Sequence, residues 1–269
     1  MEPMPDSSAA RVVAQLRAAG CVYAEDEAEI LMASARTPHE LGTMLQRRVE
    51  GLPLEHIVGW AAFHGLRIKV APGVFVPRLR TEFLVLQAAA ILRSSAGSPA
   101  GPPAGAVLDL CCGSGAIAAA LAVEFPGLKI HAADIDPVAV ACAAENLAPF
   151  GGRPHCGDLF DPLPPEQRGR ITLITANAPY VPTNDIAFMP QEARVFEPDA
   201  ALNGGADGLD IQRRIAAAAP EWLAPGGCLV VETSPAQADA SVAILKAHGF
   251  RARMSHSDEM DGTVVVGRL

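Results

Sequence analysis

Short apolar runs alternate with helical stretches over the C-terminal two thirds of the chain. Four of these runs are predicted strands: residues 106–110, 128–133, 171–176 and 228–231. Their alternation with helical segments predicts βαβ units and a mostly parallel sheet. Right-handed crossovers then place helices on both faces of that sheet. Two later runs, 250–254 and 263–266, are separated by a polar loop and are predicted to pair as an antiparallel edge.

The N-terminal part has a different periodicity. Between residues 6 and 50, apolar side chains recur at helical spacing, which predicts a small helical unit. Residues 60–77 alternate around Gly65, which predicts a β-hairpin, and a helix is expected over 81–93. The Gly-, Pro- and Ser-rich stretch 94–105 is the best candidate for a linker or exposed loop. We therefore expect a helical domain (1–58), a hairpin connector (59–80) and an α/β domain (81–269).

Composition narrows the classes of protein. A chain of 269 residues that is half apolar can bury a sizeable core in at most two compact units. A net charge of -9 argues against a large basic surface that would bind nucleic acid. The apolar runs are too short to span a bilayer and the first residues lack a signal-peptide pattern, so we expect a soluble cytoplasmic protein. The six cysteines lack metal-site spacing and are expected to be reduced, buried and free of metal.

Residues 107–122, VLDLCCGSGAIAAALA, place a strand, a glycine turn and a helix in succession. Ligands of open α/β sheets bind beyond the carboxyl ends of the strands, where a glycine turn lets backbone approach them closely. The spacing Gly113-x-Gly115-x-x-Ala118 also fits a dinucleotide fingerprint, so an NAD-dependent enzyme has to be considered.

Asp134 ends the second predicted strand, 21 residues after Gly113. Its carboxylate can accept hydrogen bonds from ribose hydroxyls of either NAD or an adenosyl cofactor. Alternatively, Asp134 or Asp136 caps the helix that begins at Pro137.

Two further acids favour an adenosyl cofactor with an amino-acid end. In the segment GDLF, Asp158 could accept from an adenine amine while Leu159 packs on the ring; the alternative is an ordinary loop acid. Asp109 could hold an ammonium group through the glycine turn or a water, and an NAD enzyme has no obvious use for it.

The stretch TANAPYVP, residues 175–182, follows the fourth predicted strand and should lie at the same rim as the glycine turn. The Asn177 side-chain oxygen and a neighbouring carbonyl can accept from a planar NH₂ group. Tyr180 can pack on that group, and its ring face favours an adjacent sulfonium through cation–π attraction. Because an amide lone pair is delocalised, positioning and desolvation must carry much of the catalysis.

The ordered segments VLDLCCGSGAIA, AADIDP, GDLF and NAPY resemble class I S-adenosylmethionine-dependent methyltransferases. More narrowly, the chain resembles the HemK/PrmC family, which methylates a glutamine side chain in translation release factors or a ribosomal protein. Residues 51–82 and 188–210 are also similar to that family, so the resemblance covers most of 30–269. It implies a Rossmann-like α/β fold with a seven-stranded, mostly parallel sheet, a small N-terminal helical domain and a connecting β-hairpin.

The resemblance also implies a set of site residues and partners. The implied catalytic residues are Asn177, Pro179 and Tyr180, and with Ala178 these residues would bind the substrate. The implied S-adenosylmethionine-binding residues are Asp109, Cys111, Cys112, Gly113, Ser114, Gly115, Asp134, Ile135, Asp158, Leu159 and Asn177. The N-terminal helices would recognise a protein substrate, a release factor or ribosomal protein, without membrane or direct nucleic-acid contact.

The chain departs from the family pattern at three places. Ala178 replaces the first proline of Asn-Pro-Pro-Tyr, which restores an N–H and frees φ, while Pro179 still favours an extended residue before it. Cys111 replaces the first glycine of the turn, although a cysteine adopts positive φ at a cost. In PRLRTE, residues 77–82, Arg80 replaces an acid. Arg78, Arg80 and Glu82 could line a substrate groove, but a solvated helix start explains Arg80 and Glu82 equally well.

Several functions remain open at this point. The first is N-methylation of a protein glutamine. The alternatives are methylation of a nucleobase amine and methylation of a small amide or guanidine metabolite. A further alternative is a non-catalytic cofactor-binding protein that lost its activity when Cys111 and Ala178 replaced the family residues. The acidic charge counts against the nucleobase. The loop NGGADG, residues 203–208, could be a mobile lid or a fixed loop.

Overall fold

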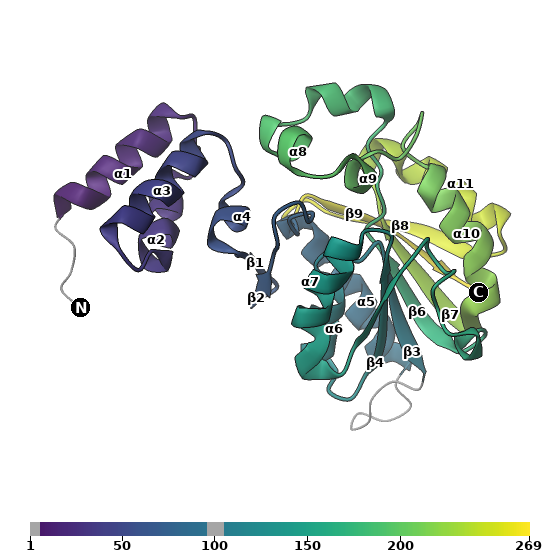
Figure 1. Ribbon diagram of the computed structural model, residues 1–269. Coiled ribbons are helices and arrows are strands. Elements are labelled where there is room, and N and C mark those ends of the chain that lie inside the picture. The colour runs from purple at the N-terminus through teal and green to yellow at the C-terminus, as the bar shows by residue number, and fades with distance from the viewer. Residues whose placement is uncertain (1–5, 96–104) are drawn as a thin grey trace.

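The computed structural model describes residues 6–95 and 105–269 (Figure 1). The predicted linker, 94–105, lies outside the described residues except at its two ends. None of the helices within these two ranges has the length and apolar character that a bilayer span needs.

One sheet organises the C-terminal part. Within the described residues it has seven strands in the order β5-β4-β3-β6-β7-β9-β8. Their bounds are β3 Ala106–Leu110, β4 Lys129–Asp134, β5 Arg153–Cys156, β6 Ile171–Ala176, β7 Leu223–Glu232, β8 Arg251–Ser257 and β9 Gly262–Arg268. The five strands from β5 to β7 run parallel, and β9 pairs antiparallel with both β7 and β8. The predicted mostly parallel α/β sheet is confirmed.

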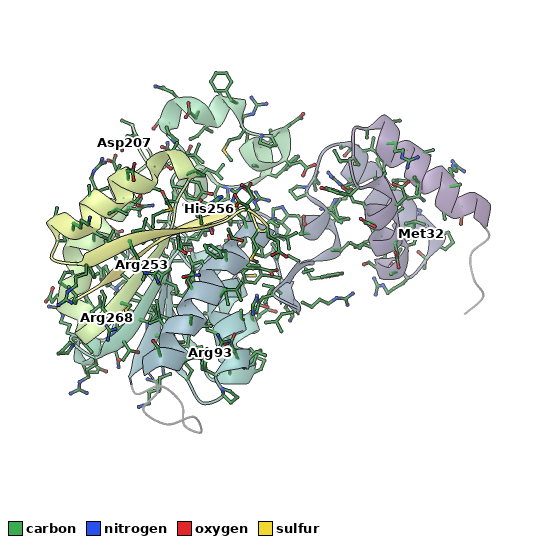
Figure 2. The ribbon with its side chains drawn as sticks, turned by 180° about the vertical axis from the view of Figure 1, so that it is seen from behind. Met32, Arg93, Asp207, Arg253, His256 and Arg268 are labelled. Carbon is green, nitrogen blue, oxygen red and sulfur yellow. The ribbon has the colours of Figure 1, made fainter. Side chains whose placement is uncertain are left out.

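The antiparallel pair differs from the prediction in one respect. β8 and β9 do pair antiparallel at one end of the sheet, but of these two only β8 is an edge strand, and β9 lies between β7 and β8. The valines of β9 are buried, whereas β8 exposes polar side chains, among them Arg253 and His256 (Figure 2). Charged side chains on an edge strand discourage pairing with another chain.

Helices cover both faces of the sheet (Figure 1). On one face lie α5 (Glu82–Ser95), α6 (Ala116–Glu124) and α7 (Pro137–Leu147). On the other lie α10 (Asp210–Trp222) and α11 (Ala238–Ala247). α6 is buried from Ala116 to Ala122, so its alanine-rich sequence packs on all sides. β3 is buried along its whole length, as expected of a central parallel strand.

The N-terminal residues form four helices with a core of their own (Figure 1). They are α1 (Asp6–Ala18), α2 (Ala24–Ser34), α3 (Pro38–Val49) and α4 (Leu54–Val58). Leu16 and Leu31 are fully buried among them. Thr37 caps α3 by accepting from the Glu40 N–H at 3.1 Å, and Pro38 occupies the first helical position. The predicted helical periodicity is therefore confirmed in this part.

A short hairpin connects these helices to the sheet. β1 (Trp60–Phe63) pairs with β2 (Leu66–Lys69), and the two turn residues, His64 and Gly65, have φ of 49° and 72°. Positive φ at both central residues matches the twist of a hairpin. The predicted hairpin over 60–77 was too long. Val74 and Val76 are buried against α7 without forming a strand, so their alternation reflects packing alone.

Two short helices lie between β6 and α10: α8 (Gln191–Phe196) and α9 (Asp199–Leu202). Arg48 of α3 joins the N-terminal helices to α8. Its side chain is 8% exposed and donates to Glu27 at 2.5 Å and to Glu192 at 2.6 Å. It also donates to the Leu52 carbonyl at 3.1 Å. One buried guanidinium therefore connects three segments.

The cysteines are all free, but their burial was only partly predicted. Cys112, Cys142 and Cys228 are buried. Cys21 and Cys111 are half-buried and Cys156 is exposed, because these three lie in turns or at a strand end rather than inside the sheet or a packed helix.

Arg48→Met should lower the free energy of unfolding by about 3 kcal/mol, because it leaves Glu27, 13% exposed, as a buried charge without its cation. Urea denaturation of the whole chain measures this. Arg36→Met is the matched control: Arg36 is 87% exposed in an ion pair within one helical turn, and its loss should leave the midpoint unchanged. Equal midpoints for the two variants would show that the Arg48 pairs contribute no stability.

Candidate functional site

The carboxyl ends of β3 and β6 lie side by side, and the strand order reverses between them. Such a switch point is where open α/β sheets bind ligands. A cavity of about 590 Å³ opens there. It is lined by segments far apart in the sequence: 73–81, 111–117, 133–136, 158–159, 177–181 and 198–203. The glycine turn, the acid at the end of β4 and the NAPY segment are thus brought together as predicted.

The glycine turn has three residues with positive φ: Cys111 at 53°, Gly113 at 51° and Gly115 at 75°. Cys111 therefore takes the left-handed conformation that a glycine would adopt without strain. A Cβ at Gly113 would meet no neighbouring atom, so the backbone there faces open space. Gly115 lies outside the cavity lining; a Cβ there would approach the Ala143 Cβ to 3.1 Å, so this glycine allows α6 to pack on α7.

Asp109 is fully buried and does not belong to the cavity lining. It accepts from the Thr175 hydroxyl at 2.8 Å and from the Ala118 N–H at 3.3 Å. Burial raises its pKa to about 7, against the effect of these two hydrogen bonds. Asp109 therefore holds the turn by joining β3, β6 and α6, and any effect on a ligand passes through that turn.

Asp134 lines the cavity next to the turn. Its Oδ2 accepts from the Gly113 N–H at 2.8 Å and its Oδ1 from the Asp136 N–H at 3.0 Å. Burial raises the pKa of this carboxyl. Asp136 is the residue that caps α7, accepting from the Val138 N–H at 2.8 Å. The capping alternative thus belongs to Asp136, which leaves Asp134 and the 60% exposed Ile135 facing the cavity.

Asp158 and Leu159 also line the cavity, and Arg214 of α10 lies with them. Arg214 forms an ion pair with Asp158, and this hydrogen bond raises the pKa of the guanidinium. Leu159 has φ of 47°, which turns the chain at the cavity wall. Sequence reasoning missed Arg214, because nothing in the helical pattern distinguishes it from Arg213 beside it.

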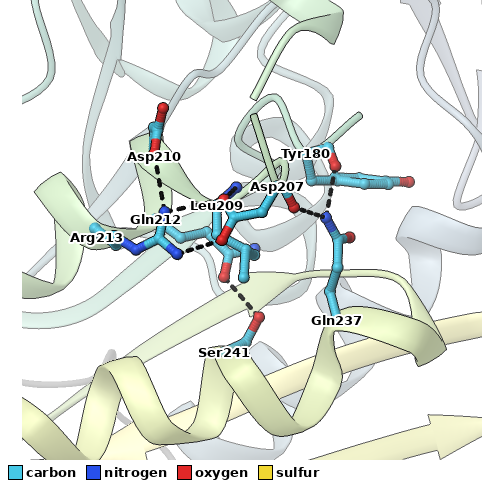
Figure 3. A network of polar contacts seen from close by, with 8 residues as sticks. All are labelled: Tyr180, Asp207, Leu209, Asp210, Gln212, Arg213, Gln237 and Ser241. Atoms are coloured by element: carbon cyan, nitrogen blue, oxygen red, sulfur yellow. Dashed lines mark hydrogen bonds and ion pairs between the residues drawn. The ribbon is translucent and has the colours of Figure 1, made fainter. Parts of the chain in front are cut away.

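In the NAPY segment, Asn177 donates through Nδ2 to the Thr81 hydroxyl at 3.2 Å. Its Oδ1 receives no hydrogen bond from the described residues, and Asn177, Ala178, Pro179 and Tyr180 all line the cavity. The Tyr180 carbonyl accepts from Gln237 at 2.9 Å, as Figure 3 shows, and the Tyr180 hydroxyl donates to Glu232 at 3.3 Å. Burial raises the pKa of Tyr180 to about 12.

The loop 203–208 is fastened to the NAPY segment. The Gly204 N–H donates to the Val181 carbonyl and the Thr183 N–H to the Gly205 carbonyl, both at 2.9 Å. Gln237 bridges the Tyr180 and Asp207 carbonyls (Figure 3). A Cβ at Gly208 would lie 2.2 Å from the Tyr180 carbonyl oxygen, so only glycine fits. These contacts favour a fixed loop over a lid.

The segment PRLRTE contributes to the cavity through Arg78, Arg80 and Thr81. Arg78 donates at 2.7 Å to Glu197, whose side chain is 1% exposed. Glu82 lies outside the lining and accepts from the His64 N–H at 2.7 Å. The groove interpretation therefore fits Arg78 and Arg80, whereas Glu82 supports the hairpin. Within the described residues, no three His, Cys, Asp or Glu side chains gather as metal ligands would.

Comparisons with known proteins agree with this geometry. Residues 107–199 match a family model described as a methyltransferase domain. The release factor glutamine methyltransferase of Geobacter sulfurreducens is 41% identical over 218 residues, which cover 79% of this chain and 72% of that protein. The corresponding protein of Bifidobacterium longum is 34% identical and covers 91% of this chain and 92% of its own length.

Among solved structures, a methyltransferase from Pyrococcus furiosus superposes with a TM-score of 0.55 at 16% identity, covering 76% of this chain and 89% of that one. This likeness concerns the fold. It confirms the predicted Rossmann-like arrangement of class I methyltransferases.

Asp134→Ala should weaken binding of S-adenosylmethionine by about tenfold or more, because it removes the carboxylate that we expect to accept from the ribose hydroxyls and that accepts from the Gly113 N–H. Titration calorimetry measures this. Asp239→Ala, at an exposed position in α11, is the control and should bind as wild type does. Unchanged affinity in Asp134→Ala would reject this placement of the ribose.

Proposed function

The chain belongs to the release factor glutamine methyltransferase family, and from this membership we propose that it methylates the side-chain amide of a glutamine in a translation release factor. It is an S-adenosylmethionine-dependent N-methyltransferase. The observation that carries the proposal on the substrate is the orientation of Asn177: Thr81 holds its NH₂ group, which leaves its oxygen as an acceptor at the cavity.

The residues around the cavity fit S-adenosylmethionine. Asp134 offers a half-buried carboxylate for the ribose, and Ile135 and Leu159 offer apolar surface for the adenine. Gly113 has no side chain and its backbone faces open space, so the amino-acid end of the cofactor can approach it closely. When bound, the cofactor supplies an electrophilic methyl group on a sulfonium.

The protein's part in the reaction is to orient and desolvate the acceptor amide. Asn177 Oδ1 would accept one N–H of the glutamine NH₂ group, and a carbonyl of the NAPY segment would accept the other. These two hydrogen bonds fix the plane of the amide, so that its nitrogen meets the methyl group in line. The Tyr180 ring would pack against the amide plane and keep water out, which matters because the amide nitrogen is a weak nucleophile.

We assign substrate recognition to the N-terminal helices and propose the division 1–58 for recognition, 59–80 for the connector and 81–269 for catalysis. Two observations support it. Arg48 ties α3 to α8, in the segment that follows the NAPY residues. Two exposed apolar side chains also suit contact with a protein. Leu79, beside the cavity, is 70% exposed, and Phe188, between the NAPY segment and α8, is 86% exposed. A release factor works on the ribosome, so the proposal places the enzyme in the cytoplasm.

Incubation of the purified protein with methyl-labelled S-adenosylmethionine and a release factor should place label on one glutamine side chain, located by mass spectrometry. Asn177→Ala should lower that rate by about a hundredfold or more, because the acceptor amide loses its orienting oxygen. Label found only on nucleic acid or on a small amide would overturn the proposed substrate.

Ala178→Pro should retain methylation within a few-fold of wild type. Within the described residues the Ala178 N–H makes no hydrogen bond that a proline would remove, and Pro179 already disfavours a helical residue at 178. The comparison of initial rates checks this. Methylation by Ala178→Pro combined with none by wild type would show that the native chain is a cofactor-binding protein without activity.

A further inference from the structure

A buried carboxylate lies behind the NAPY segment. Glu232 is the last residue of β7, is 2% exposed and is outside the cavity lining. Parallel pairing sets Ala176 of β6 opposite Val231 of β7. The next residues, Asn177 just after β6 and Glu232 at the end of β7, therefore lie side by side at the same rim.

The contacts of Glu232 lead to the NAPY segment and to PRLRTE. The Tyr180 hydroxyl donates to Oε1 at 3.3 Å, and Arg80 Nε lies 3.6 Å from the same oxygen. The Thr81 side chain also lies close enough to the carboxylate to lower its pKa. Among the described residues Oε2 is the one buried side-chain oxygen or nitrogen without a hydrogen-bond partner. A buried carboxylate that is incompletely paired costs stability, so its presence calls for an explanation other than stability.

Thr81 extends this contact to Asn177. A hydroxyl has one hydrogen to donate and can accept as well. The Thr81 oxygen accepts from Asn177 Nδ2 at 3.2 Å, which leaves the hydroxyl hydrogen available to Glu232. The Asn177 amide is thereby fixed with its NH₂ group toward Thr81 and its oxygen toward the acceptor. Without Glu232 the hydroxyl could rotate and favour the opposite amide orientation.

The backbone of Glu232 is itself held. Its carbonyl accepts from Gln212 Nε2 at 3.0 Å, and Gln212 Oε1 accepts from the Ser241 hydroxyl at 2.8 Å (Figure 3). Gln212 and Ser241 are both fully buried. The carboxylate therefore projects from a fixed point between β7, α10 and α11.

From these contacts we propose that Glu232 is a positioning residue for amide methylation. It holds the Tyr180 hydroxyl directly and the Asn177 amide through Thr81, so that one buried carboxylate orients both groups that handle the acceptor. Arg80, which stands where the resembled family has an acid, is the cation that balances it. The inference rests on the proposed function for its catalytic meaning, while the contacts themselves are independent of the substrate.

The pKa of Tyr180 depends on its contacts with Glu232 and Arg80 and can therefore be used to test them. Burial raises the pKa of Tyr180 first, the charge of Glu232 raises it further, and the charge of Arg80 lowers it. Burial likewise raises the pKa of Glu232, whereas Thr81, Arg80 and Tyr180 act to lower it. The two tyrosines of the chain are Tyr23 and Tyr180, so in a Tyr23→Phe background the phenolate absorbance belongs to Tyr180 alone.

In that background, Glu232→Gln should lower the pKa of Tyr180 and Arg80→Met should raise it. At about pH 11, Glu232→Gln should therefore contain more phenolate than the parent, and Arg80→Met should contain less. A general loosening of the site would expose Tyr180 and lower its pKa in both variants. An unchanged pKa in Glu232→Gln, or a fall in both variants, would overturn the proposal.

Glu232→Gln should also lower kcat for release-factor methylation by about tenfold or more, because it removes the negative charge and replaces one of the two acceptor oxygens of the carboxylate by a donor. The KM for S-adenosylmethionine should stay unchanged. Glu221→Gln, at an exposed glutamate near the opposite end of the sheet, is the matched control and should keep full activity. Wild-type kcat in Glu232→Gln would refute the positioning role. If wild type itself leaves release factors unmethylated, the proposed function fails, and the tyrosine titration alone decides on the contacts of Glu232.

Discussion

Parallel pairing of β6 with both β3 and β7 is the constraint on which the site depends. It brings the ends of three strands to one rim, so that the glycine turn, Asn177 and Glu232 become neighbours although more than a hundred residues separate the first from the last. β4, paired on the other side of β3, adds Asp134 to the same rim. Because each functional residue lies at the end of its strand or just after it, a shift of register by one residue would move that residue away from the site and turn the buried face outward.

Buried polar side chains connect the other segments around the site. Asp109 connects β3, β6 and the start of α6 beneath the turn, and Glu197 connects the end of α8 to Arg78 and Val76. Arg48 links α3 to α8. In each case a charge is taken out of water and compensated by contacts from segments distant in sequence. Such groups add little net stability, but they tolerate few alternative arrangements of the segments that they connect.

The three departures from the family pattern are each accommodated in a different way. Cys111 takes the left-handed conformation that the turn requires, with a conformational cost that the surrounding contacts absorb. Ala178 is buried, and the following proline keeps it extended. Arg80 lies beside the carboxylate of Glu232, where a cation partly offsets a buried negative charge. All three residues line the cavity together with the rest of the site.

The sequence by itself determined the periodic features: the buried strands, the helices, the α/β class and the order of the motifs. These follow from local spacing, because a buried parallel strand must be apolar and a turn must contain residues suited to its φ. Tertiary structure decided the rest. The sequence could not show that Asp136, and not Asp134, caps α7, that β9 lies inside the sheet, or that Val74 and Val76 are packed without forming a strand. It also could not single out Thr81, Arg214 and Glu232, because each acts through a partner 50 or more residues away, and such pairings exist only once the sheet has brought the strand ends together.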